Sequence, residues 1–256
     1  MRTVKVRNTV LGEGLPKICV PITGTSEMEI KTQAEAAALA GADLVEWRAD
    51  YLKPALLNEI MERTFSTIRG ILGEIPLIFT VRTSREGGNR EISTEDYVKL
   101  YKKAAALGQA DLIDLEVETL RNDGHEPGQV IRQLQQAGAL VLASNHHFEG
   151  TPSTEEIVAQ LMTMDRDGAD LLKEAVMPKS SGDVLALLRA TEMMKALTEK
   201  PVITMSMGRL GMISRMSGEI FGSVMTFGTV GNSSAPGQIP LEELRMALKV
   251  LHGGAH

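Results

Sequence analysis

The sequence contains a single cysteine, Cys19, and this scarcity excludes two kinds of protein. An internal disulfide framework and a cysteine-based zinc cluster both need more than one cysteine. Long apolar runs are also missing, since no stretch reaches the ~18 residues that suggest a membrane-spanning helix. Residues 1–14 have no apolar centre, so we expect no signal peptide and an intracellular, cytoplasmic protein without a membrane partner.

An excess of basic residues is absent as well. Lysine and arginine number 27 against 33 aspartates and glutamates, which gives a formal net charge of −6. Because nucleic acids are bound largely through clustered positive charge, and no basic stripe is visible, we expect no nucleic-acid partner. Hydrophobic residues make up 43% and charged residues 23%, which is typical of a globular protein with a large core. No linker interrupts the chain, and we expect one domain over residues 1–256.

Short β-rich runs alternate along the chain with longer helical patterns. The expected strands cover residues 17–22, 43–50, 76–82, 110–119, 139–147, 169–177, 201–207 and 222–228. Eight strand–helix units in 256 residues are typical of an α/β protein with a parallel (β/α)8 barrel, the TIM-barrel fold. A doubly wound open sheet is the alternative, but its Gly-rich phosphate turn is missing from "PITGTSE". Residues 3–14 predict a β-hairpin that closes the bottom of the barrel.

Local signals mark the helix ends. A serine followed three residues later by an acidic residue forms a capping-box pattern, which predicts a helix start. The pattern occurs at Ser93–Asp96, Ser153–Glu156 and Ser180–Asp183. Glycines stand where helices are expected to stop, at Gly41, Gly108, Gly138 and Gly168.

Alternation of side chains along each strand defines which polar residues face the barrel interior. The inward polar sets are Glu46 and Arg48 in the second strand, Arg82 in the third, and Asp114, Glu116 and Glu118 in the fourth. Barrel interiors are normally filled by branched apolar residues, so inward charges indicate an active-site mouth or a polar barrel core. Because alternate strands share a layer, we expect Glu46, Lys173 and one of the first two carboxylates of the fourth strand to lie close together.

Lys173 lies in the middle of an otherwise apolar strand, "GADLLKEAVMP" at residues 168–178. A buried ammonium is costly unless it is paired. One interpretation is a structural ion pair, and the other is a Schiff-base lysine whose amine is made neutral by burial. The same alternation turns Glu174 toward the helices, where the sequence identifies no partner for its carboxylate.

Two histidines, His146 and His147, end the fifth strand in "ASNHHF". Active sites of these barrels lie at the carboxyl ends of the strands, and a histidine there can act as general acid and base. Glu86 in "SREGGNR", on the loop after the third strand, is a candidate acidic partner. Considered singly, each of these residues also fits an ordinary surface position.

Two arginines follow the seventh strand, Arg209 and Arg215 in "GRLGMISRMSGE". Arginines at a barrel mouth bind carboxylate or phosphate groups through a bidentate fork, although each alone also fits a surface salt bridge. The loop after the eighth strand, "SSAPGQIP" at 233–240, reads as mobile and is not a glycine-rich phosphate nest. The sequence therefore favours a carboxylate ligand.

These motifs together carry a family resemblance that runs almost from end to end. They are "EWR" at 46–48, "FTVRTSREGG" at 79–88, "IDLE" at 113–116, "SNHHF" at 144–148, "LLKEAVMP" at 171–178, "ITMSMGRLGMISR" at 203–215, "GSVMTFG" at 222–228 and "SAPGQ" at 234–238. Each is modest alone, but all of them in this order are highly specific. The chain closely resembles the type I 3-dehydroquinate dehydratases of the shikimate pathway.

The resemblance implies a role for each matched residue. Lys173 matches the Schiff-base lysine, His146 the catalytic histidine, and Glu86 the acidic residue that orients this histidine. The implied substrate contacts are Arg215 for the carboxylate; Glu46, Arg48 and Arg82 for ring hydroxyls; Ser234 and Gln238 in a closing loop; and Met205, Met207 and Phe227 in an apolar wall. The resemblance further implies a small-molecule substrate, 3-dehydroquinate, no metal or organic cofactor, and a homodimer.

Two positions depart from the family pattern. His147 stands where relatives often have an acidic residue, and Glu174 where they are usually apolar. Two other functions stay open. A transaldolase-type aldolase would also form an imine but usually needs a phosphate site, and a non-catalytic barrel would not need Lys173, His146 and Glu86 together.

Overall fold

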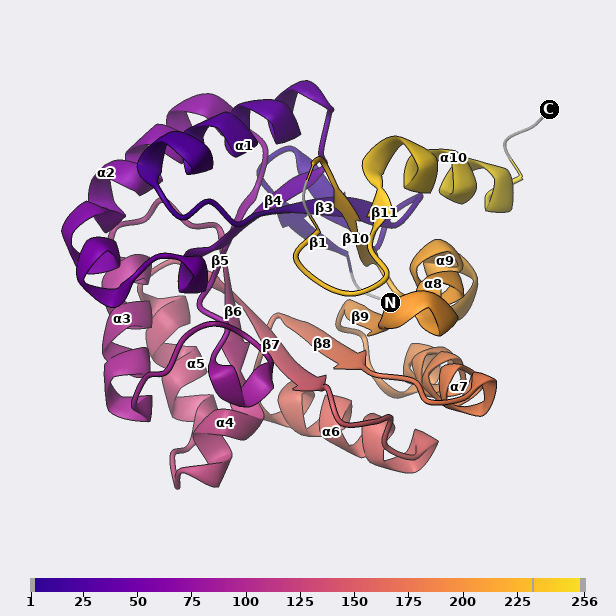
Figure 1. Ribbon diagram of the computed structural model, residues 1–256. Coiled ribbons are helices and arrows are strands. Elements are labelled where there is room, and N and C mark those ends of the chain that lie inside the picture. Colours follow the sequence, from indigo (N-terminus) through magenta and orange to yellow (C-terminus); the bar gives the residue numbers. More distant parts are fainter. Residues whose placement is uncertain (1–2, 232, 254–256) are drawn as a thin grey trace.

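The computed structural model describes residues 3–231 and 233–253, in which a curled parallel sheet is surrounded by helices (Figure 1). The extreme ends of the expected single domain, including the first two residues of the N-terminal segment, lie outside these ranges. The strands of the sheet are β3 (Lys17–Ile22), β4 (Leu44–Arg48), β5 (Leu77–Thr80), β6 (Leu112–Glu116), β7 (Leu140–His147), β8 (Leu171–Val176), β9 (Val202–Ser206), β10 (Met225–Thr229) and the short β11 (Ile239–Pro240).

The sheet closes on itself to form the predicted barrel. Its strands pair in the order β11-β10-β3-β4-β5-β6-β7-β8-β9, and every pair is parallel. The two ends meet where Val202 bridges to Ser223 and the amide of Val224 donates to the carbonyl of Val202 at 2.9 Å. This closure and the sequential strand order confirm the TIM-barrel prediction and exclude the doubly wound alternative.

Helices cover the outside of the barrel (Figure 1). They are α1 (Glu27–Leu39), α2 (Pro54–Leu72), α3 (Thr94–Ala106), α4 (Val117–Asn122), α5 (Pro127–Gln136), α6 (Thr154–Asp167), α7 (Ser181–Leu197), α8 (Gly208–Met216), α9 (Gly218–Phe221) and α10 (Leu241–Leu251), with the 3-10 turns η1 (Ala49–Tyr51) and η2 (Ser84–Glu86). Across residues 3–231 and 233–253, no helix combines the length and the apolar character that a membrane crossing requires.

The predicted helix signals lie at real helix ends. Ser153 and Ser180 form reciprocal capping boxes, whereas Ser93 accepts a hydrogen bond from the Asp96 amide without the reciprocal contact. Gly168 ends α6 at a φ of 95°, a left-handed conformation that costs glycine little. The other three predicted stops, Gly41, Gly108 and Gly138, also have positive φ and follow directly after helix caps.

Some expected boundaries were wrong. The fourth expected strand, 110–119, is cut short because the chain turns into helix α4 at Val117. Glu118 therefore lies on that helix and does not share the inward face of Asp114 and Glu116. The two-residue strand β11 was not predicted, because two residues are too few to show a period.

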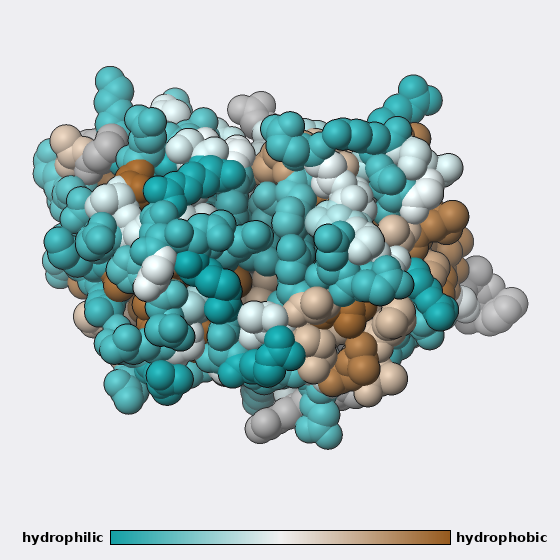
Figure 2. Space-filling model, turned by 90° about the horizontal axis from the view of Figure 1, so that it is seen from below, coloured by the Kyte–Doolittle hydropathy of each residue, from teal (hydrophilic) through white to brown (hydrophobic). Residues whose placement is uncertain are grey.

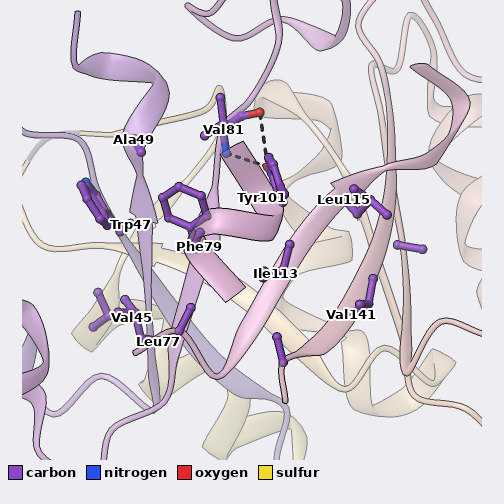
Figure 3. Packing of buried hydrophobic residues seen from close by; sticks show 14 of the residues in the cluster. Val45, Trp47, Ala49, Leu77, Phe79, Val81, Tyr101, Ile113, Leu115 and Val141 are labelled. Carbon is purple, nitrogen blue, oxygen red and sulfur yellow. Dashed lines mark hydrogen bonds between the residues drawn. The ribbon is translucent and has the colours of Figure 1, made fainter. Parts of the chain in front are cut away.

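An aromatic cluster fills the layer between the strands and helices α2 and α3. Phe79 of β5 lies between Trp47 and Tyr101, with ring centroids 5.5 and 5.6 Å away (Figure 3). Each such pair contributes about 0.5–1.5 kcal/mol beyond area burial. The Tyr101 hydroxyl accepts a hydrogen bond from the Val81 amide and donates to the Asp114 carbonyl, both at 2.8 Å. The cluster therefore fixes β4, β5 and β6 relative to one another.

A second apolar cluster fills the lower part of the barrel and extends toward the carboxyl ends of the strands through Met205 and Phe227. Residues near the amino ends of the strands, among them Leu44, Leu112 and Leu171, pack together inside it. Val6 and Leu11 of the hairpin β1 (Val4–Val6) and β2 (Thr9–Leu11) belong to the same cluster. The hairpin thus closes the bottom of the barrel as predicted, and the polar residues are left to occupy the opposite end.

Candidate active site

A pocket opens at the carboxyl ends of the strands, and all twelve predicted site residues line it. They are Glu46, Arg48, Arg82, Glu86, His146, Lys173, Met205, Met207, Arg215, Phe227, Ser234 and Gln238. Strand alternation explains why β4 and β8 contribute their polar residues to the same space.

Lys173 is buried, and its ammonium has a partner. The Nζ atom lies 2.7 Å from Oδ2 of Asp114 on β6 and 4.8 Å from the centre of the Phe227 ring. Burial alone would raise the pKa of Asp114, but the charges of Arg82 and Lys173 hold it well below its usual range. Of the two carboxylates predicted to approach Lys173, Asp114 is therefore the one that pairs with it.

His146, at the end of β7, is held by the predicted acidic partner. Its Nδ1 atom lies 2.8 Å from Oε2 of Glu86 in η2, whose Oε1 accepts a hydrogen bond from Thr119 at 3.2 Å. Burial, assisted by the nearby positive charges of Arg82 and Lys173, lowers the pKa of His146 well below its ordinary value. The imidazole is therefore neutral near pH 7 and can accept a proton.

Arg82 links the acidic groups beneath the pocket. Nη1 donates to Glu116 at 2.9 Å and to Ser144 at 3.2 Å, while Nη2 donates to Asp114 at 2.7 Å. Its Nη1 also lies 3.7 Å from Glu86. Most of the fork is therefore engaged with buried acceptors, and its predicted contact with a ring hydroxyl stays a prediction.

Arg48 is oriented by a neighbour that sequence reasoning did not select as a site residue. Nε and Nη2 of Arg48 donate to the two carboxylate oxygens of Asp50, at 2.8 and 2.9 Å. Asp50 also accepts from the Arg82 amide at 3.3 Å. The expected strand 43–50 counted Asp50 as the next inward position after Arg48, but Asp50 lies on η1, beyond the end of β4, so strand alternation does not explain its direction.

Arg215 enters the pocket from α8 and contacts the loop that follows β10. Its Nη2 donates to the Pro236 carbonyl at 3.1 Å, and its Nε has no hydrogen-bond partner among the described residues. Burial lowers the pKa of Arg215 to about 10, which still leaves it charged at neutral pH. The same loop is braced by Gln238, whose Oε1 accepts from the Ser234 amide at 2.9 Å.

A family model described as Type I 3-dehydroquinase matches residues 18–255. The chain belongs to this family. The 3-dehydroquinate dehydratase of Listeria monocytogenes serotype 4a (strain HCC23) is 44% identical over 252 residues, 98% of this chain and 99% of that protein.

Solved structures agree with this membership. The crystal structure of 3-dehydroquinate dehydratase from Geobacillus kaustophilus HTA426 has a TM-score of 0.93 and 38% identity, covering 100% of this chain and 98% of that one. The Clostridium difficile type I 3-dehydroquinate dehydratase, solved with covalently modified comenic acid, has a TM-score of 0.93 and 42% identity, with 99% of each chain covered.

Arg209 does not share the site. It was predicted beside Arg215 as a cation of the barrel mouth, but its side chain is exposed and it does not line the pocket. The two arginines lie six positions apart on α8, which places them on different faces of the helix. The pocket thus receives one arginine from this segment.

Phe148 lines the pocket, although it was not predicted as a site residue. Its ring packs against Gly87, where an added Cβ would lie 2.3 Å from the ring. This contact fixes the turn that carries Glu86 against the end of β7. Within the described residues, no cluster of three or more His, Cys, Asp or Glu side chains is arranged to hold a metal ion.

Glu174 faces the helix layer as predicted, and the structure supplies its missing partner. Nε2 of His147, on the neighbouring strand, lies 2.7 Å from Oε1 of Glu174. The two residues that were expected to depart from the family pattern, His147 and Glu174, are therefore in contact with each other.

Proposed function

We propose that the chain is a hydro-lyase that dehydrates 3-dehydroquinate to 3-dehydroshikimate through a Schiff base on Lys173, with His146 as general acid and base. The observation that carries the proposal is the shared pocket. A buried lysine amine and a histidine oriented by Glu86 line the same apolar-walled cavity. Membership of the type I 3-dehydroquinase family supports the same reaction.

The first step forms the imine. The Lys173 ammonium gives one proton to solvent water, and its nitrogen lone pair attacks the substrate ketone. A second proton moves from this nitrogen to the former ketone oxygen to give a carbinolamine, and the solvent proton is taken up again when the carbinolamine hydroxyl leaves as water. Loss of water from this adduct leaves a protonated imine, which withdraws electrons from the adjacent carbon–hydrogen bond. Asp114, 2.7 Å from Nζ, orients the amine and compensates the positive charge of the iminium.

His146 carries the proton through the elimination. With Nδ1–H donated to Glu86, the other ring nitrogen is free to remove the proton next to the imine carbon. The electron pair flows into the iminium to form an enamine, which then expels the ring hydroxyl. His146 returns its proton to this hydroxyl, so it leaves as water, and hydrolysis of the imine releases the product and Lys173.

The remaining predicted residues hold the substrate for these steps. Arg215, whose Nε is unpaired among the described residues, binds the substrate carboxylate. Ring hydroxyls contact Glu46, Arg48 and Arg82, the loop bearing Ser234 and Gln238 closes over the substrate, and Met205, Met207 and Phe227 form the apolar wall. Fixing the ring in this way aligns the proton, the base and the leaving group.

Turnover of 3-dehydroquinate tests the proposal directly. Formation of the conjugated enone product is followed by its ultraviolet absorbance. The wild-type protein should show product, and Lys173→Ala should lower kcat by at least about 10⁴-fold, because the covalent route is lost. A wild-type protein that folds but yields no product would contradict the proposal and favour an aldolase or a non-catalytic barrel.

We also propose a cytoplasmic homodimer that works without metal or organic cofactor and binds neither nucleic acid nor membranes. Family likeness and the net charge of −6 support these points. Hydrophilic residues cover most of the face in Figure 2, but an apolar area interrupts them on one side, as a contact between two copies would require. Light scattering should give the mass of two chains. Full activity in the presence of EDTA should show that the reaction needs no metal ion.

A further inference from the structure

A buried acidic group lies directly behind the pocket, and the proposed reaction does not use it. Glu174 is 0% exposed, and its Oε1 atom lies 2.7 Å from Nε2 of His147. Glu174 comes from β8 and His147 from β7, which are neighbouring parallel strands. The contact therefore bridges the two strands that carry the imine-forming lysine and the proposed base.

Strand alternation places this contact next to the catalytic groups in sequence but on the opposite face. Lys173 immediately precedes Glu174, and His146 immediately precedes His147. The first member of each pair lines the pocket, while the second faces the helices. A change in the contact between Glu174 and His147 therefore shifts the backbone only one residue away from Lys173 and from His146.

The surroundings of Glu174 make His147 its principal partner. Neither carboxylate oxygen of Glu174 has a well-aligned hydrogen bond among the described residues, so the charge contact with His147, assisted by the Asn145 side chain, is what offsets burial. The His147 ring is itself held by Gln160 of α6, whose Oε1 lies 3.2 Å from Nε2.

Other groups around the contact are neutral or negative. Asn145 lies opposite Glu174 on β7 and accepts a hydrogen bond from the Glu118 amide of α4 at 3.3 Å. On the other side, Thr204 of β9 is opposite Glu174 in register. Two further acidic groups lie near the contact: Glu118 of α4, whose negative charge acts on both Glu174 and His147, and Glu156 of α6, which is close to His147.

The contact holds one proton near neutral pH. Burial raises the pKa of Glu174 to about 7 despite the nearby imidazole. Burial would lower the pKa of His147, but its contact with Glu174 outweighs this and raises it. Two groups this close titrate as a unit, and with one proton the unit has no net charge. Losing that proton leaves an uncompensated carboxylate behind Lys173.

We propose that Glu174 and His147 are positioning residues for the reaction. Their contact holds β7 and β8 so that the lysine amine and the catalytic imidazole keep the separation that the reaction needs. The inference rests on the proposed function. Displacements of about 1 Å in an active site can cost a hundredfold in rate, so a brace one residue away has catalytic consequences.

Removing the charge from either partner tests the inference. Glu174→Gln and His147→Gln, singly and together, are assayed with 3-dehydroquinate across the neutral pH range. Each single variant should lower kcat about tenfold and change KM less than about twofold, since Arg215 and Glu46 lie on other elements. An inflection near pH 7 in the wild-type profile should be absent from Glu174→Gln, and the double variant should be no slower than the worse single one.

Thr191→Val is the matched control. It removes a buried hydroxyl of α7 that contacts Thr204 on β9, the residue opposite Glu174 in register, and it leaves the charges of Glu174 and His147 in place. It should lower the stability of the protein while leaving kcat and the pH profile unchanged.

Wild-type kcat and pH profile in folded single variants would overturn the inference and leave the contact a purely structural brace. If the single variants do not fold, the double variant Glu174→Leu and His147→Leu replaces the contact by apolar packing. A folded double variant with about tenfold lower kcat supports the inference, and wild-type kcat contradicts it. A wild-type protein without a borohydride-trapped imine would overturn the proposed function itself, and this inference with it.

Discussion

At the residue scale, the ion-pair and Schiff-base interpretations of Lys173 turn out to be compatible. The ammonium lies 2.7 Å from Asp114, so its burial is compensated in the resting protein. A carboxyl whose pKa is held well below its usual range is a weak base. In the proposed mechanism, Asp114 therefore orients the amine and balances the later iminium charge, and it is a poor acceptor for the proton that Lys173 must lose.

Asp114→Asn should separate this role from simple packing. The amide keeps the size of the side chain but removes the charge that faces Lys173 and Arg82. We expect kcat to fall at least about a hundredfold and the protein to lose about 3 kcal/mol of stability, because two buried cations lose a counter-ion. Kinetics and urea unfolding measure both. Asp165→Asn is the control: Asp165 pairs with Lys200 and does not line the pocket, so kcat should stay unchanged. A wild-type kcat in Asp114→Asn would refute the proposed role of Asp114.

Individual site residues were predictable where backbone alternation decides their direction. Glu46 and Lys173 face inward because side chains in strands alternate, whatever their neighbours are. The partner of Glu174 was not predictable, since it depends on the register between β7 and β8 and on the rotamer of His147. Arg209 was wrongly predicted at the barrel mouth, because the sequence alone does not show which face of helix α8 points toward the pocket.

At the scale of elements, the turn η2 has to lie against the end of β7 for Glu86 to reach His146. Gly87 follows Glu86 directly, adopts a φ of 75°, and receives the Phe148 ring in the space where another residue would have its Cβ. The turn and the strand end are therefore interlocked by a glycine and an aromatic ring, and the hydrogen bond between Glu86 and His146 depends on that fit.

Gly87→Ala should break this fit. The new methyl would collide with Phe148, so the turn shifts and Glu86 loses its contact with His146; we expect kcat to fall at least about tenfold. Gly124→Ala is the matched control, because Gly124 also has a positive φ, 78°, but its Cβ would meet nothing within 4 Å. Both variants should lose about 1 kcal/mol to backbone strain. Equal kcat values in the two variants would contradict the interlock.

Element boundaries were the least predictable part of this chain. The strand ending at Glu116 continues into α4 without a turn signal, so Glu118 was assigned to the wrong element. Phe148 lines the pocket from beyond the end of β7, where no period indicates direction. The serine signals at the starts of α6 and α7 and the glycine signal at the end of α6 were confirmed, because capping depends on local hydrogen bonds and local backbone conformation.

At the scale of the whole molecule, the barrel separates stability from chemistry along its axis. The hairpin and the amino-end members of the second apolar cluster close one end, and the pocket with its charged residues occupies the other. Eight repeated strand–helix units made this architecture predictable from sequence, since each unit carries the same pattern. Extension of one domain over the full 1–256 range stays a prediction.

Leu11→Ala tests this separation. Leu11 is fully buried in the lower cluster, so the cavity should cost about 2–5 kcal/mol, while kcat at a temperature where the variant is folded should match the wild type. Leu39→Ala, 91% exposed on α1, should change stability by less than about 0.5 kcal/mol. Thermal unfolding and steady-state kinetics check both, and a large loss of kcat in Leu11→Ala would show that the two ends are coupled.

The most direct test of the central claim is borohydride reduction in the presence of 3-dehydroquinate, followed by peptide mass mapping, on the wild type and on His146→Ala. The proposed mechanism predicts a stable adduct on Lys173 in both proteins, because His146 acts after the imine has formed, with turnover lost only in the variant. Turnover by the wild type without any adduct on Lys173 would contradict the imine mechanism. An adduct in the wild type but none in His146→Ala would contradict the division of roles between the two residues.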